Sequence, residues 1–232
     1  MKRATLPVTS LVALLGHPVA HSLSPRMQNA ALAARGLDWR YEAFDVEDPL
    51  AAVDALRTLG FAGANVTIPH KRAVVGACDE ADGDSVNTLV FRDGRVFGFN
   101  TDREILAGIT ASRACVIGAG GAAAALAPAL PDDTRVYSRR GVWPPDASGC
   151  DLIVNATPVR DELLVRPEPH QTVVDLAYGC DETALVAAAR AAGCEVVDGL
   201  EALVRQGAAS FRLWTGLEPP VEVMRASLGL AG

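Results

Sequence analysis

Residues 114–123, ACVIGAGGAA, carry the most informative pattern for the fold of this 232-residue chain. An apolar run leads into a glycine-rich turn, and an alanine-rich segment follows, which indicates a strand, a tight turn and a helix. Gly118 and Gly120 would let the backbone approach a pyrophosphate closely at the start of that helix, and the sixth position, Ala123, is small. A plain strand-turn-helix connection would also account for so short a motif, so the surrounding sequence has to support it.

The next strand of this segment ends in Ser138, Arg139 and Arg140, about 20 residues after the glycine turn, with no acidic residue. An acid at this place would bind the ribose hydroxyls of NAD, whereas guanidinium groups suit the 2′-phosphate of NADP through charge-assisted hydrogen bonds. We therefore expect NADP as the cofactor, with NAD as the alternative. Two solvated surface arginines are the plain structural alternative.

Strand and helix signals alternate along the chain, which predicts the α/β class with parallel sheets covered on both faces. No helix is expected in residues 141–148, where a doubly wound fold normally has one, and we expect Trp143 with Pro144 and Pro145 to cover the sheet there. Strands are predicted near 11–15, 39–45, 61–66, 86–91, 113–117, 134–138, 151–154 and 172–176, and helices at 25–35, 48–59, 102–110, 121–130, 181–192 and 199–214.

The composition is that of a globular protein, with 50% hydrophobic and 21% charged residues, a net charge of −7 and a pI near 5.1. The acidic balance argues against nucleic acid and anionic membranes as partners, so small molecules are expected. The five cysteines form no C-x-x-C pair, which indicates reduced thiols and neither a disulfide framework nor a metal site. The apolar run at 11–15 is short for a signal peptide and is interpreted as a buried strand of a cytoplasmic protein.

Polar clusters precede the glycine turn: Ser22 with Ser24, residues 65–71 (NVTIPHK), and residues 100–102 (NTD). Together they offer hydroxyl, amide, ammonium and carboxylate groups to a small polyhydroxylated acid. Each cluster also has a plain structural interpretation. Ser24 could cap a helix that begins at Pro25, residues 101–104 fit a capping box, and a single lysine is usually a solvated surface charge.

The whole set resembles the shikimate dehydrogenase family. The resemblance rests on residues 16–25 (GHPVAHSLSP), 63–71 (GANVTIPHK), 86–88 (VNT), 100–102 (NTD), 118–122 (GAGGA), 155–158 (NATP) and 198–200 (DGL) leading to Gln206. It implies a substrate-binding α/β domain at residues 1–104, joined by a C-terminal helical stretch at 206–232. Residues 105–205 would form a Rossmann-like, doubly wound dinucleotide-binding domain.

The resemblance also implies the site and the reaction, which is the reversible NADPH-dependent reduction of 3-dehydroshikimate to shikimate in the chorismate pathway. Lys71 and Asp102 would be the catalytic pair, and Ser22 and Ser24 would hold the substrate carboxylate. The remaining substrate contacts would be Thr67, Asn87, Asp102, Tyr178 and Gln206. The cofactor contacts would be Gly118, Gly120, Gly121, Ala122, Ser138, Arg139, Arg140, Asn155, Ala156, Thr157 and Gly199, with no metal.

Departures from the family pattern lie mainly in the cofactor half. Arg103 stands where the family usually has glycine, Glu201 and Ala202 replace a Gly-Met pair, and residues 159–161 (VRD) replace the usual continuation. Quinate or aminoshikimate dehydrogenase activity remains an alternative, as does a non-catalytic regulator that binds shikimate-like ligands or nucleotide. The expected assembly is a monomer or a homodimer.

Overall fold

The structure is a computed structural model that describes residues 10–179 and 181–230. It divides into two compact units, one built from Met1–Phe99 with Ser210–Gly232 and the other from Asn100–Ala209. The predicted division of substrate and dinucleotide roles at residues 104 and 205 is functional and stays a prediction. The α/β class expected from the sequence is confirmed, with one sheet in each unit.

The first unit is built on a mixed sheet of order β2-β1-β3-β5-β6-β4. Strands β2, β1 and β3 are parallel, but β5 is antiparallel to β3 and β6 is antiparallel to β5. The expectation of a wholly parallel sheet is therefore wrong here. The strands are β1 (Ser10–Gly16), β2 (Trp39–Asp45), β3 (Gly63–Val66), β4 (Glu80–Ala81), β5 (Thr88–Arg92) and β6 (Arg95–Phe99).

A two-residue turn at Asp93 and Gly94 produces the antiparallel part of this sheet. Both residues have positive φ, 52° and 73°, which matches the right-handed twist of a tight hairpin. Arg92 pairs with Arg95 directly across the turn. The Asp-Gly dipeptide between two apolar runs was therefore a hairpin signal, and β6 is a strand that the sequence analysis missed.

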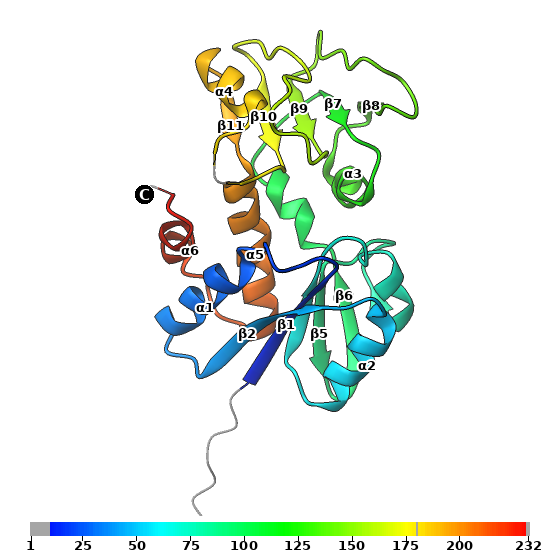
Figure 1. The fold of residues 1–232 in the computed structure, drawn as a ribbon, viewed down its shortest axis with the longest axis vertical. Helices are drawn as coiled ribbons and strands as arrows, with labels where there is room; N and C mark the ends of the chain where they lie inside the picture. Colours follow the sequence, from blue (N-terminus) through cyan, green and yellow to red (C-terminus); the bar gives the residue numbers. More distant parts are fainter. Residues whose placement is uncertain (1–9, 180, 231–232) are drawn as a thin grey trace, which may run out of the picture. The chain divides into compact units, whose positions relative to one another are not determined.

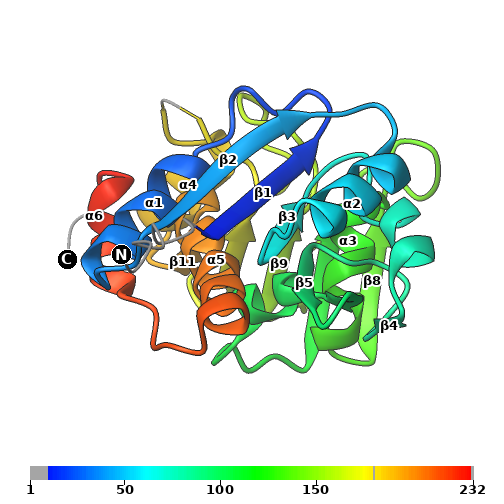
Figure 2. The same cartoon turned by 90° about the horizontal axis from the view of Figure 1, so that it is seen from below.

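Helices α1 and α2 lie on opposite faces of the first sheet (Figures 1 and 2). Asp48 caps α2 by accepting hydrogen bonds from the N–H groups of Leu50 and Ala51, and Pro49 occupies its first turn. The C-terminal helix α6 packs against α1, which confirms the predicted return of the chain to the first domain. The helices are α1 (Ser24–Ala34), α2 (Pro49–Thr58), the 3-10 helix η1 (Ala73–Ala77) and α6 (Val221–Ser227), while α5 (Gly199–Thr215) begins in the second unit and ends in the first.

The second unit contains a fully parallel sheet of order β11-β10-β9-β7-β8. The strand order reverses direction at β7, the strand that carries the glycine turn, as in a doubly wound fold. One face is covered by η2, α3 and the start of α5, and the other by α4 and two loops. The elements are η2 (Thr101–Leu106), β7 (Arg113–Ile117), α3 (Gly121–Leu126), η3 (Ala127–Ala129), β8 (Asp133–Tyr137), β9 (Leu152–Asn155), β10 (Thr172–Asp175), α4 (Ala184–Ala191) and β11 (Glu195–Val197).

The connection from β8 to β9 contains no helix, as predicted, but the sheet there is covered differently from the expectation. Trp143 is 37% exposed and lies outside the apolar cluster, so its assignment as the cover is wrong. Ala147 and Cys150 from this loop and Leu164 from the next are buried against the sheet residues instead.

Three predicted helices are shorter than expected, among them the one predicted at 181–192, which is α4 (Ala184–Ala191). The helix expected at 102–110 is the single 3-10 segment η2, and the one expected at 121–130 changes from α3 to a 3-10 turn at Ala127, next to Pro128. Proline removes a backbone donor and clashes with the preceding turn, which explains the early end of α3. No helix in residues 10–179 and 181–230 combines the length and apolar character needed to cross a membrane.

Candidate active site

In the first unit, the backbone brings three of the predicted site residues together at one end of the inner strands β1, β3 and β5. Thr67 follows β3, and its N–H donates to the carbonyl of Leu15 at 2.8 Å. The carbonyl of Lys71 accepts from Val86 at 2.9 Å, and the carbonyl of Asn87 accepts from Val66 at 2.8 Å. Thr67 and Lys71 are half-buried, whereas Asn87 is buried.

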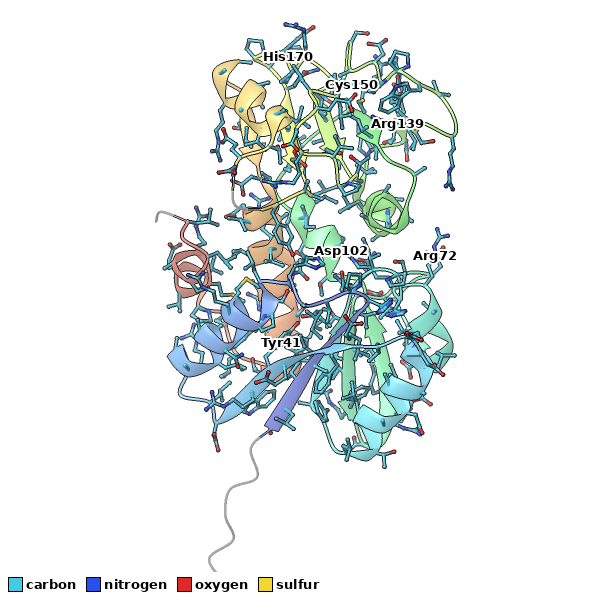
Figure 3. The ribbon with its side chains drawn as sticks, viewed as in Figure 1. Tyr41, Arg72, Asp102, Arg139, Cys150 and His170 are labelled. Carbon is cyan, nitrogen blue, oxygen red and sulfur yellow. The ribbon has the colours of Figure 1, made fainter. Side chains whose placement is uncertain are left out.

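A buried hydrogen-bond network centres on Asn65, one position before the end of β3. Its Nδ2 donates to Asn87 O, Thr88 Oγ1 and Ser210 Oγ, each at 3.0 Å. Its Oδ1 accepts a 2.8 Å bond from the hydroxyl of Tyr41, which is labelled in Figure 3. The network therefore fixes the backbone next to Asn87 and joins it to the C-terminal segment.

Ser22 and Ser24 lie at the start of α1. The predicted cap at Ser24 is wrong, because the helix already begins there and Leu23 occupies the N-cap without a side-chain hydrogen bond. The hydroxyl of Ser22 accepts a 3.2 Å bond from the N–H of Ser24. Within the described part of the chain, the Ser24 hydroxyl makes no hydrogen bond although the residue is 7% exposed, so it is available to a ligand.

Asp102 and Gln206 both belong to the second unit. The predicted capping box beginning at Thr101 is wrong in its cap residue, since Asn100 caps η2 by accepting from the Asp102 N–H at 3.1 Å. Asn100 is itself held by a 2.7 Å bond from its Nδ2 to Ala125 O. Asp102 is 7% exposed, and Gln206 donates to Leu203 O at 2.9 Å within α5.

The glycine turn has the geometry that a dinucleotide site needs. Gly118 has φ +114°, and a Cβ there would stand 2.9 Å from the carbonyl oxygen of Ala156, so only glycine fits. At Gly120 and Gly121 a Cβ would meet no atom within 4 Å, which leaves open space beside the backbone. Ala122 is half-buried in the first turn of α3.

Asn155 shapes the neighbouring turn after β9. Its side chain accepts from the N–H and hydroxyl of Thr157, at 3.0 and 2.6 Å, and donates to Asp175 at 2.8 Å. Burial raises the pKa of Asp175 above its usual value, although hydrogen bonds from Thr183, Ala177 and Asn155 oppose the shift. The side chains of Asn155 and Thr157 are thus engaged inside the protein, where they hold Ala156 beside Gly118.

Tyr178 and Gly199 line a hollow of about 160 Å³ beyond β10 and β11 in the second unit. A Cβ on Gly199 would stand 2.5 Å from Ala177 O and 2.8 Å from the Tyr178 Cβ. Glycine at position 199 is therefore required by the close approach of the Tyr178 segment. The carboxylate of Asp198 caps α5 directly after this contact.

Arg139, labelled in Figure 3, lies in the loop after β8 and is not free in this structure. Its Nη2 donates to Glu162 at 2.6 Å, and its guanidinium carbon lies 5.4 Å from the centre of the Trp143 ring. Arg140 is exposed and makes no ion pair within the described ranges, while Ser138 is half-buried.

Several polar residues of these two sites were not identified from the sequence: Tyr41, Thr88, Asp175, Glu162 and Ser210. Thr88 stands inside the quoted VNT motif and Asp175 at the end of a predicted strand, so position could have indicated them. Nothing in the local sequence of Glu162 or Ser210 pointed to a partner.

In residues 10–179 and 181–230, no group of three His, Cys, Asp or Glu side chains could hold a metal ion. Cys78, Cys115, Cys150 and Cys194 are free thiols, and Cys180 lies outside the described residues.

Comparison with known proteins gives two family matches. A model described as the shikimate dehydrogenase substrate binding domain matches residues 14–88, and one described as the shikimate 5′-dehydrogenase C-terminal domain matches residues 199–228. The shikimate dehydrogenase (NADP(+)) of Moorella thermoacetica is 40% identical over 269 residues, covering 93% of this chain and 91% of the relative. That alignment is longer than the 232 residues of this chain, so the relative has segments that this chain lacks.

Two solved structures extend the comparison. Shikimate 5-dehydrogenase from Thermus thermophilus, in complex with NADP(H) and shikimate, is 36% identical with a TM-score of 0.81 and covers 94% of this chain and 98% of its own. Quinate dehydrogenase from Corynebacterium glutamicum, in complex with NAD, is 28% identical with a TM-score of 0.81 and covers 95% and 98%.

Proposed function

Because this chain belongs to the shikimate dehydrogenase family, we propose that it catalyses the reversible NADPH-dependent reduction of 3-dehydroshikimate to shikimate, a step of aromatic amino acid biosynthesis. The 40% identity to an NADP-dependent shikimate dehydrogenase across 93% of the chain is the observation that carries this proposal. The protein is then an oxidoreductase. Residues 1–104 with 206–232 would bind the substrate, and residues 105–205 the dinucleotide.

The substrate is a cyclic acid with ring hydroxyls, and the polar residues of the first unit suit it. The free hydroxyl of Ser24 and its neighbour Ser22 would hold the carboxylate. Thr67 and Asn87 would bind ring hydroxyls, as would Gln206, with Tyr178 near the substrate. The Asn65 network supports this role because it fixes the backbone at Asn87 before any ligand arrives.

Lys71 would act as the general acid. The carbonyl carbon of 3-dehydroshikimate receives a hydride, its oxygen becomes an oxyanion, and the Lys71 ammonium donates the proton that completes the new hydroxyl. In the reverse direction, neutral Lys71 would take that proton back. Asp102 would bind the adjacent ring hydroxyl and orient the reacting groups.

The residues of the second unit fit NADP, which supplies the hydride in its reduced form. Open space at Gly120 and Gly121 would admit the pyrophosphate, and Gly118 allows the tight turn that creates this space. Arg140 offers an exposed guanidinium group after β8, with Ser138 nearby, and Arg139 offers a second one that is paired with Glu162. Ala122, Ala156 and the turn held by Asn155 and Thr157 would border the cofactor. Gly199, which lets the Tyr178 segment approach closely, would lie at its nicotinamide end.

The test is reduced-nicotinamide absorbance during incubation with shikimate and NADP. Lys71→Ala should lower kcat by about 10²- to 10⁴-fold, the usual contribution of general acid catalysis. Arg72→Ala is the matched control, since Arg72 is the adjacent cation and its side chain is exposed (Figure 3). A Lys71→Ala variant as fast as the wild type would contradict the assigned role, and wild-type protein without turnover would contradict the function.

Quinate dehydrogenase activity is the second candidate, favoured by the similarity to the Corynebacterium glutamicum enzyme. The same assay with quinate in place of shikimate separates the two, because the enzyme should show the higher kcat/KM for its own substrate. We further propose a cytoplasmic location and a monomeric or homodimeric state, which light scattering on the purified protein would test.

A further inference from the structure

The guanidinium of Arg139 is held between an acid and an aromatic ring. A tight turn returns the chain after β8, with Ser138 N–H donating to Val142 O at 3.0 Å and Gly141 N–H donating to Ser138 O at 2.9 Å. This turn brings Trp143 back to within 5.4 Å of Arg139. Glu162 arrives from the loop after β9 and accepts the 2.6 Å bond from Arg139.

The Arg139–Glu162 pair is exposed, so a ligand can replace Glu162 as the partner of Arg139. The two side chains are 64% and 55% exposed, and pairs of this kind contribute little to stability. A phosphate dianion forms stronger, often bidentate bonds with a guanidinium than a single exposed carboxylate does. An incoming phosphate would therefore compete with Glu162 for Arg139. If both anions stayed beside Arg139, the phosphate and the Glu162 carboxylate would repel each other.

We propose that Glu162 is a specificity residue that moves the nucleotide preference of this chain toward NAD. This inference rests on the proposed function, since it concerns the same cofactor. Glu162 competes with the 2′-phosphate of NADP for Arg139, which weakens NADP binding. In NAD the same ribose position carries a hydroxyl, which can donate to the Glu162 carboxylate beside the Arg139 guanidinium.

The acid that an NAD-binding fold usually has at the end of its second strand is thus supplied by a different loop. Ser138, Arg139 and Arg140 alone predict NADP, whereas the folded chain places a carboxylate on Arg139. Arg140 makes no ion pair in the described ranges, so it remains available to a 2′-phosphate. The structure therefore gives this position a binding group for each of the two nucleotides.

The test measures the dissociation constants of NADP⁺ and NAD⁺ by isothermal titration calorimetry, without substrate. Glu162→Gln removes the charge and keeps the size, and the ratio Kd(NAD⁺)/Kd(NADP⁺) should rise about three- to tenfold, as expected from losing an exposed carboxylate partner. Asp161→Asn is the matched control because it removes the same charge one residue away, at an exposed side chain with no ion pair in the described part of the chain. Its ratio should stay at the wild-type value.

A local readout comes from Trp143, one of three tryptophans, whose fluorescence should respond when a nucleotide displaces Glu162 from Arg139. Trp143→Phe identifies that signal. An unchanged ratio in Glu162→Gln, or the same rise in Asp161→Asn, would overturn the specificity role of Glu162. If shikimate turnover with NADP persisted in that case, the proposed function would stand without it.

Discussion

The hydroxyl of Tyr41 donates a 2.8 Å hydrogen bond to Oδ1 of Asn65, which lies 24 residues away and on a strand that is not adjacent to that of Tyr41. Tyr41 is fully buried, and the side-chain amide of Asn65 donates hydrogen bonds to Asn87, Thr88 and Ser210. The bond therefore completes the set of partners of the residue on which the proposed substrate site is built.

Tyr41→Phe should lower the free energy of unfolding by about 1–3 kcal/mol, because it leaves the Asn65 oxygen buried without a partner. Urea denaturation followed by circular dichroism measures the change. Tyr137→Phe is the matched control, since the Tyr137 hydroxyl makes no hydrogen bond within the described residues, although the residue is 7% exposed. Equal losses in the two variants would contradict the argument.

The two glycines of the dinucleotide turn should respond differently to alanine. Gly118→Ala places a Cβ 2.9 Å from the Ala156 carbonyl at φ +114°, so we expect a loss of about 1–3 kcal/mol in unfolding free energy. The Cβ that Gly120→Ala adds meets no atom within 4 Å, so this substitution should change the free energy of unfolding by less than about 0.5 kcal/mol. Calorimetry with NADP⁺ should nevertheless show weaker binding to Gly120→Ala, and unaltered affinity would argue against a pyrophosphate at this turn.

The hydrogen-bonded pair of His17 and Asp45 should make the stability of the first unit depend on pH. Their Nδ1 and Oδ1 atoms are 2.5 Å apart, and the bond raises the pKa of His17 above 6.5 and lowers the pKa of Asp45 below 3.8. The stabilisation of the folded state that comes from the raised pKa of His17 is complete below pH 6.5. It is lost as the pH rises through the pKa that His17 has in the folded protein. The stabilisation that comes from Asp45 is present above pH 3.8 and is lost as the pH falls through the lowered pKa of Asp45 in the folded protein.

A histidine NMR titration tests this pair. In Asp45→Asn the pKa of His17 should fall toward 6.5, and in Glu47→Gln it should fall less, because Glu47 contributes only a smaller Coulombic attraction. A His17 titration curve that Asp45→Asn does not shift would rule out the pair.

The thiols of Cys115, which is buried, and Cys78, which is half-buried, should be unreactive in the folded protein. Burial raises the pKa of Cys115 to about 12 and that of Cys78 to about 11, so few thiolates exist at neutral pH. Iodoacetamide followed by peptide mass spectrometry should therefore label Cys115 only after denaturation in urea. Rapid labelling of Cys115 in native protein would mean that the second sheet opens at β7.

The α/β class, the eight strands that lie in apolar runs, the glycine turn and the loop that lacks a helix follow from the amino-acid sequence alone. These features are local, because apolar periodicity and the conformational needs of Gly118 act over a few neighbouring residues. The resemblance to the family indicated the polar residues of the proposed site, and some of them, such as Ser24, Thr67 and Asp102, stand at the end of a predicted strand or the start of a predicted helix.

The folded chain was needed to show which side chains bond within the protein and which are open to a ligand. Asn155 and Thr157 bond inside the protein, Asn100 caps η2 in place of Thr101, and Asp93-Gly94 adds the hairpin strand that makes the first sheet mixed. Glu162 meets Arg139 across 23 residues of chain. Such pairings depend on how strands and loops come together over long sequence separations, and a local pattern holds no information about them.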